Sequence, residues 1–477
     1  MSRRWQIALF WTIAAAGVAM HVVFWLCKTG MHYPDEIFQY IEPAFVRIKG
    51  FGWLPWEFDR GVRNWSIIAF YGGWMKLFMA FGADGAWLHR LIGLHNTLLA
   101  LAVFPAALRL GRLYGGETGG WTAAILSALL PPIVFFTPHP LSEVPSMVLS
   151  TWGIVFWLEG RGKENERRHA FLAGMLIGLS VVVRFFSAVF VLVPLFDYTA
   201  RLLRRKGGVL YYLLGGLVAI ALLGLSDWLT WGKPFHSAIE YFRYNILEWG
   251  NADHGVSPWW QYALWLYARI NWGLVVFIPL LLIGAWRTKL LFATSLLALA
   301  SLCLISHKEE RFILGVWPLL VITFSAGIAQ VGRWLKDRAW VNALAASVLS
   351  AALMASTAFG TAKLEWHWLG GLFKAQEFVG AQRDVSGCMF EGRLHLSGGS
   401  SYINKNVPMD SYQTKLSRNP LFNYFIFLEN STDTRFARMR KWIELARIDD
   451  VVVFRRPDTA LIAPGVKAPV SKKPPIP

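Results

Sequence analysis

Residues 209–231 read VLYYLLGGLVAIALLGLSDWLTW, and the fold class of the chain can be inferred from them. The only charged residue of this stretch is Asp227, close to the end of the run. A helix needs about 20 predominantly apolar residues to cross roughly 30 Å of hydrocarbon. The stretch therefore predicts a membrane-spanning helix.

Comparable apolar stretches recur through the first three quarters of the chain, and about eleven of them satisfy the length criterion. They are residues 6–27, 87–110, 118–137, 142–159, 169–184, 186–200, 209–231, 259–286, 289–306, 312–332 and 340–359. The pair that flanks Arg184 is short and also fits one kinked or re-entrant hairpin. Hydrophobic residues make up 55% of the chain and charged residues only 16%, against about 25% charged in soluble domains. We predict an all-α polytopic membrane protein.

The basic residues account for a formal net charge of +17 and fall in short clusters between apolar stretches. Lys and Arg concentrate in cytoplasmic loops, and one orientation places every cluster on one side. This pattern predicts a cytoplasmic amino terminus and argues against nucleic-acid binding. The segments predicted to lie outside are residues 28–86, 138–141, the turn at Arg184, 232–258, 307–311 and everything after residue 360.

The cytoplasmic loops predicted in this way contain only about 5 to 12 residues, whereas a nucleotide-binding domain needs about 100. No Gly-rich phosphate loop or Asp-x-Asp signature occurs in the sequence. We therefore expect no nucleotide cofactor. The three cysteines and the dispersed histidines, for which we expect solvated positions, indicate neither a disulfide framework nor a metal site.

The first outside loop begins with residues 32–43, which read HYPDEIFQYIEP. Pro34 breaks the chain, and Asp35 and Glu36 then open a short amphipathic helix that fits the membrane surface. Carboxylates at the start of a helix also serve as simple N-terminal caps. The two acids are therefore candidate catalytic residues or caps.

Residues 54–65 of the same loop read LPWEFDRGVRNW and mix acids, guanidinium groups and indoles. Trp56, Glu57 and Arg63 are candidates for binding a ligand. Interfacial anchoring explains the tryptophans as well as stacking on a sugar does. Glu143, which follows the outside loop 138–141, and Asp227 are further candidates for this role.

The loop at residues 307–311 reads HKEER and lies between two apolar stretches. Ionisable residues there are costly unless they face water or a ligand, so the cluster is a candidate site. The alternative is that the long side chains reach to the headgroups, and Arg184 has the same two interpretations.

Three motifs together resemble the Alg9-like and GPI-anchor mannosyltransferases, which form family GT22 of the GT-C superfamily. They are the Pro-Asp-Glu loop, the Trp-Glu-x-x-x-x-x-Arg-Asn stretch and the His-Lys-Glu-x-Arg-Phe loop, in the order and spacing of that family. The resemblance covers roughly residues 1–360. It implies a GT-C transmembrane domain and inverting transfer of mannose from a dolichyl- or polyprenyl-phosphate donor to a glycolipid or glycan. Asp35 matches the acid of that family in the first outside loop.

This chemistry needs a base for the acceptor hydroxyl and cations for the departing phosphate. We expect Asp35 to be the base, with Glu36 as the second choice or as a residue that orients the acceptor. The candidates for binding the donor phosphate are Arg184, His307, Lys308 and Arg311. No metal is expected, and the partners implied are the lipid-linked donor, the acceptor and membrane lipids.

The segment after residue 360 is more polar than the spans and forms a second predicted domain, residues 361–477. It contains a predicted strand at 422–428, an amphipathic helix at 434–448 and a strand at 451–454. This order predicts a small extracytoplasmic α/β domain that caps the site, recognises the acceptor or covers the ends of the spans. Residues from about Lys467 are rich in Pro and Lys, which predicts disorder.

Two other functions fit parts of the pattern. A lipid flippase or transporter is expected to show internal repeats and ionisable residues near the middle of its spans, whereas the polar residues of this chain gather on one face of the membrane. A related GT-C enzyme that transfers another sugar, such as glucose or aminoarabinose, would share the same motifs. Compact loops favour a bacterial inner membrane, and the endoplasmic reticulum membrane is the alternative.

Overall fold

The computed structural model describes residues 3–202, 208–335, 339–364, 369–392, 394–413 and 419–457. The chain divides into two compact units. The first comprises Met1–Phe24, Asn96–Pro138 and Ser142–Leu364, and the second comprises Trp25–His95, His139–Leu141 and Glu365–Pro477. The predicted disorder from Lys467 lies outside the described residues.

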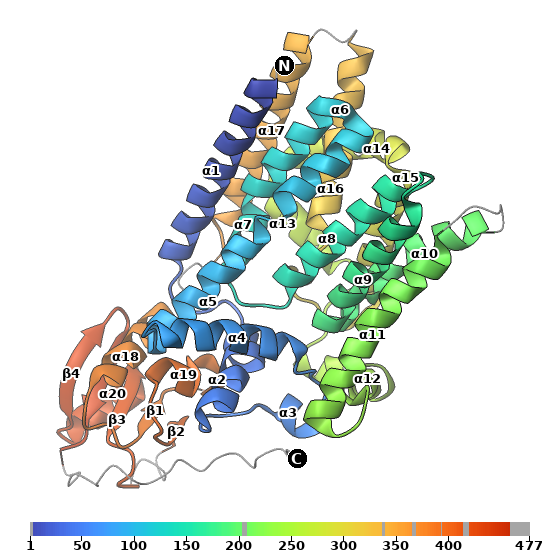
Figure 1. Cartoon of the computed structure of the whole chain (residues 1–477). Coiled ribbons are helices and arrows are strands. Elements are labelled where there is room, and N and C mark those ends of the chain that lie inside the picture. The colour runs from blue at the N-terminus through green and yellow to red at the C-terminus, as the bar shows by residue number, and fades with distance from the viewer. Residues whose placement is uncertain are drawn as a thin grey trace. The chain divides into compact units, whose positions relative to one another are not determined.

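The first unit is a bundle of helices (Figure 1). Its longer helices are α1 (Arg3–Cys27, whose last turn enters the second unit), α6 (Val103–Leu129), α8 (Glu143–Gly160), α9 (Glu166–Val183), α10 (Val189–Leu202), α11 (Val209–Trp231), α13 (Gln261–Ile270), α14 (Leu274–Arg287), α15 (Lys289–Leu304), α16 (Trp317–Trp334) and α17 (Ala339–Thr361). Shorter helical segments are α7 (Pro131–Phe136), η2 (Phe185–Ala188), α12 (His236–Phe242), η3 (Arg243–Leu247), η4 (Gly250–His254), η5 (Asn271–Gly273) and η6 (Glu310–Ile313).

Every predicted apolar stretch is helical over most of its length. In the part of the chain that the structure describes, five helical segments are long and apolar enough to cross a membrane. They are Gly85–Leu129, Phe185–Leu202, Val209–Trp231, Gln261–Arg287 and Ala343–Thr361. The protein is thus a multi-pass membrane protein, and the count of about eleven spans stays a prediction.

Glycines allow the helices of the bundle to pack closely. α9 packs against α11, where a Cβ added to Gly174 or Gly215 would overlap backbone of the facing helix. α14 packs against α16 in the same way at Gly284 and Gly327. Apolar helices gain little from the hydrophobic effect inside lipid, so close backbone approach supplies much of their association.

Two breaks in the bundle have local causes. Gly116 interrupts α6 with φ 61° and ψ −154°, between the predicted stretches 87–110 and 118–137. Arg184 is extended (φ −150°, ψ 107°) and separates α9 from η2 and α10. The second break places a cation at the end of an apolar helix.

The second unit combines the first outside loop with the tail of the chain. Its helical segments are η1 (Glu36–Ile41), α2 (Glu42–Lys49), α3 (Trp56–Arg60), α4 (Ser66–Ala80), α5 (Gly85–Ala100, whose end enters the first unit), α18 (Gly370–Ala381), η7 (Leu394–Leu396), α19 (Gly399–Ile403) and α20 (Thr432–Met439). Its strands are β1 (Cys388–Phe390), β2 (Met409–Ser411), β3 (Tyr424–Leu428), β4 (Ile443–Ile448) and β5 (Val451–Arg455).

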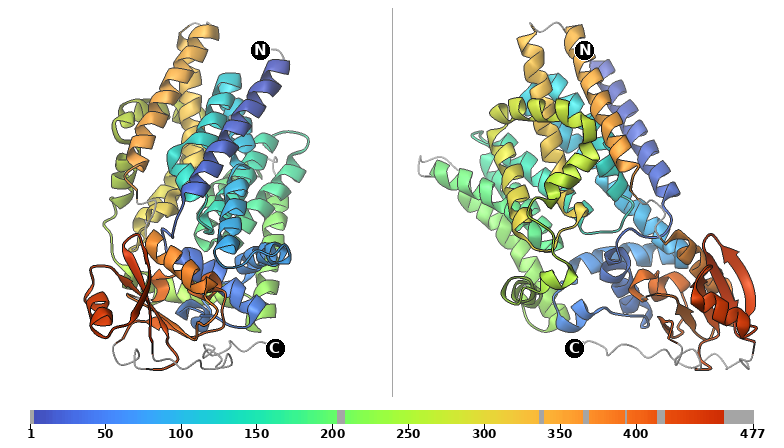
Figure 2. Two further views of the ribbon diagram at one scale, coloured as in Figure 1. Left: turned by 90° about the vertical axis from the view of Figure 1, so that its left-hand side faces the viewer. Right: turned by 180° about the vertical axis from the view of Figure 1, so that it is seen from behind.

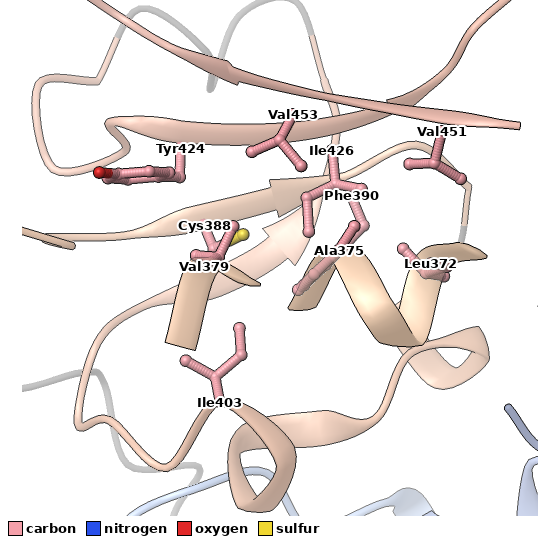
Figure 3. Packing of buried hydrophobic residues seen from close by; sticks show 10 residues of the cluster. All are labelled: Leu372, Ala375, Val379, Cys388, Phe390, Ile403, Tyr424, Ile426, Val451 and Val453. Carbon is pink, nitrogen blue, oxygen red and sulfur yellow. The ribbon is translucent and has the colours of Figure 1, made fainter. Parts of the chain in front are cut away.

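The five strands form one sheet in the order β2-β1-β3-β5-β4 (Figure 2). β1 pairs in parallel with β2 and β3, whereas β5 runs antiparallel to β3 and β4. Successive side chains of a strand point to opposite faces, and both faces of the central strands are buried. Figure 3 shows one of these faces, where Leu372, Ala375 and Val379 of α18 pack over strand residues such as Phe390 and Ile426.

The tail elements agree with the sequence in part. The predicted strands at 422–428 and 451–454 are confirmed as β3 and β5. The predicted helix at 434–448 is wrong beyond Met439, because Ile443–Ile448 forms strand β4. Antiparallel pairing with β5 satisfies the backbone of β4 and outweighs the helix propensity of its Glu, Leu, Ala and Arg residues.

Candidate active site

Glu36 is fully buried in the second unit and accepts hydrogen bonds on both carboxylate oxygens. Oε1 accepts from the backbone N–H groups of His32 at 2.7 Å and Tyr33 at 2.9 Å, and from Nδ1 of His139 at 2.8 Å. Oε2 pairs with Nζ of Lys28 at 2.7 Å. Burial opposes ionisation, but His139 and Lys28 outweigh it and hold the pKa of Glu36 well below its usual range. The Glu36 carboxylate is thus committed to holding the loop.

Asp35 immediately precedes η1 and is partly exposed. Glu57 on α3 lies close enough to Asp35 for the two carboxylates to interact electrostatically. Burial raises the pKa of Glu57, the Asp35 carboxylate adds to this effect, and Arg63 opposes it. Nε2 of Gln39 donates to Glu57 at 3.1 Å, and Arg63 approaches Glu57 to 3.9 Å. The second unit therefore brings together Asp35, Glu57 and Arg63 of the predicted set.

Trp56 is the first residue of α3 and is exposed by 39%. Asp59, on the same short helix, is exposed as well. The indole adjoins Glu57 in sequence and is open to solvent or membrane. Both predicted roles of Trp56, interfacial anchor and sugar platform, require this exposure.

In the first unit, two arginines converge on Glu143. Nη1 of Arg184 lies 2.8 Å from Oε1 of Glu143, and Nε of Arg311 lies 3.3 Å from the same oxygen. The Arg184 guanidinium also lies over the Phe312 ring, 4.7 Å from its centroid. The Arg184 side chain is 18% exposed, whereas those of Glu143 and Arg311 are 2% and 4% exposed. The break after α9, the start of α8 and η6 thus assemble a cluster in which Arg184 is the accessible cation.

His307 and Glu309 extend this cluster. Nε2 of His307 lies 3.2 Å from Oε1 of Glu309, and Glu309 also pairs with Arg311. The hydrogen bond that His307 donates to Glu309 raises the pKa of His307 against the opposing effect of burial. Burial opposes ionisation of Glu309, but Arg311 and His307 lower its pKa to about 2. Glu309 therefore stays charged at neutral pH and favours the imidazolium form of His307.

Lys308 and Asp227 both form hydrogen bonds that stabilise neighbouring segments of the chain. Nζ of Lys308 donates to the carbonyl of Ser257 at 3.1 Å and to that of Ile305, which joins the loop at residues 307–311 to the segment before α13. Asp227, in the last turn of α11, accepts from the backbone N–H of Ser237 at 2.8 Å and from its hydroxyl at 2.7 Å. These bonds hold the start of α12.

Sequence reasoning missed several partners in this arrangement. His139 was expected to be solvated but is buried against Glu36, so that expectation was wrong for this residue. Lys28 and Gln39 carry no local pattern that would mark them as partners of Glu36 and Glu57. Within the described ranges, no group of three or more His, Cys, Asp and Glu side chains is arranged to hold a metal ion.

Comparison with known proteins gave matches of three kinds. The model of the Alg9-like mannosyltransferase family matches residues 11–365. GPI mannosyltransferase 3 of Yarrowia lipolytica is 25% identical over 414 residues, covering 84% of this chain and 76% of that protein. Human GPI alpha-1,2-mannosyltransferase 3 is 23% identical over 311 residues, covering 64% of this chain and 55% of that protein. The chain thus spans little more than half the length of the human relative.

Solved structures share the fold at low sequence identity. The structure of ArnT from Cupriavidus metallidurans bound to undecaprenyl phosphate has a TM-score of 0.62 and 13% identity, covering 95% of this chain and 98% of that one. The archaeal oligosaccharyltransferase AglB of Archaeoglobus fulgidus, in complex with an inhibitory peptide and a dolichol-phosphate, has a TM-score of 0.57 and 12% identity, covering 91% and 71%. Both similarities concern the fold alone.

Proposed function

Because the chain belongs to the Alg9-like mannosyltransferase family, we propose that it transfers mannose from a polyprenyl-phosphate donor to a glycolipid or glycan acceptor, with inversion, on the non-cytoplasmic face of the membrane. The names of the relatives support a mannose donor and a glycolipid acceptor. The lipids in the two structural neighbours support a polyprenyl-phosphate donor.

The observation that carries the catalytic assignment is the contrast between two adjacent carboxylates. Glu36 is buried and its oxygens already accept four hydrogen bonds, so it has little capacity for a fifth proton donor. Asp35 is partly exposed and lies beside Glu57, so an acceptor hydroxyl can reach its carboxylate. We assign Asp35 as the base and Glu36 as the residue that orients its loop.

The proposed reaction balances as a single displacement. Asp35 accepts the proton of the acceptor hydroxyl, the hydroxyl oxygen attacks the anomeric carbon, and the bond from that carbon to the phosphate oxygen breaks. The electron pair leaves with the polyprenyl phosphate. Arg184, together with Arg311 and protonated His307, supplies the positive charge for this leaving group, and Glu143 orients both guanidinium groups.

Roles for the remaining predicted residues follow from their contacts. Trp56, Glu57 and Arg63 are proposed to bind the sugar or the acceptor, since Glu57 lies near Asp35, Arg63 approaches Glu57, and Trp56 precedes Glu57 on α3. Lys308 is proposed to contribute positive charge near the donor phosphate while its backbone contacts hold the loop. Asp227 supports α12 and is proposed to act on the acceptor only through that helix.

The decisive experiment measures transfer of radiolabelled mannose from polyprenyl-phosphate mannose in membranes that contain wild type, Asp35→Asn or Asp59→Asn at matched expression. Asp59 is the control because it is an exposed carboxylate in the same loop. We expect Asp35→Asn to lower the rate by about 10²–10⁴-fold, the usual contribution of a general base, and Asp59→Asn to transfer normally. Retention of transfer within a few-fold in Asp35→Asn would refute the base assignment.

The same assay separates the alternatives. Transfer by wild type from lipid-linked glucose or aminoarabinose, and not from mannose, would replace the proposed donor. Movement of the lipid across the bilayer without transfer would favour a flippase. The bacterial inner membrane stays a prediction, and the two relatives named above are from eukaryotes.

A further inference from the structure

Glu42 connects two parts of the second unit that are far apart in sequence. It is the first residue of α2, which follows η1 without interruption, and it is fully buried. Its Oε1 accepts from the backbone N–H groups of Trp53 at 3.1 Å and Ser400 at 2.9 Å. Its Oε2 accepts from the backbone N–H of Ser401 at 2.8 Å. One carboxylate therefore joins the first outside loop to the start of α19 in the tail.

The surroundings of Glu42 are shaped closely around the carboxylate. Gly52 (φ 127°) and Gly399 (φ 69°) adopt backbone conformations that favour glycine. A Cβ added to Gly52 would lie 2.8 Å from Oε1 of Glu42, and one added to Gly399 would lie 2.5 Å from Oε2. These three donors are backbone N–H groups, the Ser401 hydroxyl also hydrogen-bonds the carboxylate, and a side chain with two acceptor oxygens satisfies them. An amide at position 42 would offer one oxygen and turn an N–H group toward another N–H group.

The contacts around this carboxylate continue on both sides. Nε2 of His89 lies 3.0 Å from the hydroxyl of Ser401. Ile37 and Phe38 of η1 pack in one apolar cluster with Phe373 of α18. The start of the segment that follows Asp35, at Ile37, Phe38 and Glu42, thus contacts the tail.

We propose that Glu42 is a positioning residue, which fastens α2 to the tail and thereby holds η1 and Asp35 in the geometry that the transfer reaction needs. This inference rests on the proposed role of Asp35. Misplacement of a reacting group by about 1 Å can cost roughly 10²-fold in rate. Loss of this connection should therefore lower kcat while the donor KM changes little, because the cationic residues assigned to the donor phosphate belong to the other unit.

The test uses two variants of the full-length chain that weaken the connection from opposite sides. Glu42→Gln removes an acceptor from the loop side. Ser400→Pro removes one donor from the tail side and puts a ring carbon against Oε1 of Glu42, so it breaks the same contact without changing the carboxylate itself. Glu429→Gln is the matched control, because Glu429 forms a surface ion pair with Arg447 at 3.2 Å in the same domain and such pairs contribute little.

The readouts are kcat, donor KM and hydrogen–deuterium exchange of the backbone amides at residues 36–49. We expect both variants to lower kcat about 10–100-fold and to speed exchange, the double variant to lose less than the product of the two, and the control to match wild type. Normal kcat in Glu42→Gln, or lost activity with unchanged exchange, would overturn the proposal.

Two further outcomes separate the proposals from each other. If wild type transfers no sugar, the proposed function fails, and unchanged exchange in both variants would additionally refute the connection. If Glu42→Gln does not fold, Ser400→Pro with the same readouts decides, since it leaves the carboxylate in place.

Discussion

At the scale of single residues, the adjacent carboxylates of Asp35 and Glu36 have different surroundings, and their different proposed roles rest on this contrast. Four donors saturate Glu36, while Asp35 stays partly exposed beside a second carboxylate. The sequence placed both acids in an outside loop but did not distinguish them. The distinction depends on Lys28 and His139, and His139 is 103 residues away from Glu36, beyond the reach of any local pattern.

His307 provides a prediction about pH. Its pKa is raised by Glu309, so the imidazolium is fully present below the ordinary value of 6.5 and is lost as the pH rises through the higher folded value. His307 is proposed to bind the phosphate of the lipid-linked sugar donor. The KM for that substrate should then rise about fivefold across that interval, because a charged imidazolium N–H binds a phosphate about 1 kcal/mol more tightly than a neutral imidazole N–H does. Steady-state kinetics between about pH 6 and 9 measure this.

The control for this prediction is His307→Gln, whose donor KM should be high and independent of pH in that range. His169→Gln, which alters a histidine that contacts the carbonyl of Asn165 on α9, should retain the wild-type profile. An unchanged rise of KM in His307→Gln would assign the titration to another group.

At the scale of elements, the helices were predictable because long apolar runs leave the backbone no other way to satisfy its hydrogen bonds in lipid. The strand β4 was not predictable, because its sequence suits a helix and only the neighbouring β5 makes it a strand. The cationic cluster was predictable only in part. Arg184 and Arg311 were predicted as site residues because charged side chains are costly in apolar surroundings, but their shared ion-pair partner, Glu143, is visible only in the structure.

The packing of α14 on α16 yields a prediction about stability. A methyl group at Gly327 would overlap the carbonyl oxygen of Leu280, so Gly327→Ala should force the helices apart and cost about 1–3 kcal/mol. Gly73→Ala in α4 meets nothing within 4 Å and should be neutral or stabilise by about 0.5–1 kcal/mol. Thermal unfolding of both purified variants in detergent compares them. Equal midpoints would show that α14 and α16 do not approach as closely as described.

At the scale of the whole molecule, the sequence predicted a domain boundary near residue 360. In the structure, residues 25–95 belong to the same compact unit as the tail. Glu42 and Ser400 are 358 residues apart in sequence, and the hydrophobic periodicity of a single segment cannot predict such a contact. Their hydrogen bond requires the first outside loop and the tail to lie on the same side of the membrane. This agrees with the orientation predicted from the basic clusters.

Cysteine labelling checks this orientation. In a background with Cys27, Cys303 and Cys388 replaced by serine, Met439→Cys lies at a site that is 75% exposed, and Lys163→Cys lies in the exposed turn between α8 and α9. A membrane-impermeant maleimide should label Met439→Cys in intact cells, or in sealed vesicles with the outer face exposed, and Lys163→Cys only after permeabilisation. The reverse pattern would invert the proposed topology.

The connection between the first loop and the tail also has a consequence for biosynthesis. A ribosome that adds roughly 5–20 residues per second needs roughly 20–70 seconds to pass from Glu42 to Ser400. During that interval a nascent chain holds the Glu42 carboxylate and the apolar residues of η1 without their partners in the tail. The first loop can therefore complete its packing only after α19 has been synthesised.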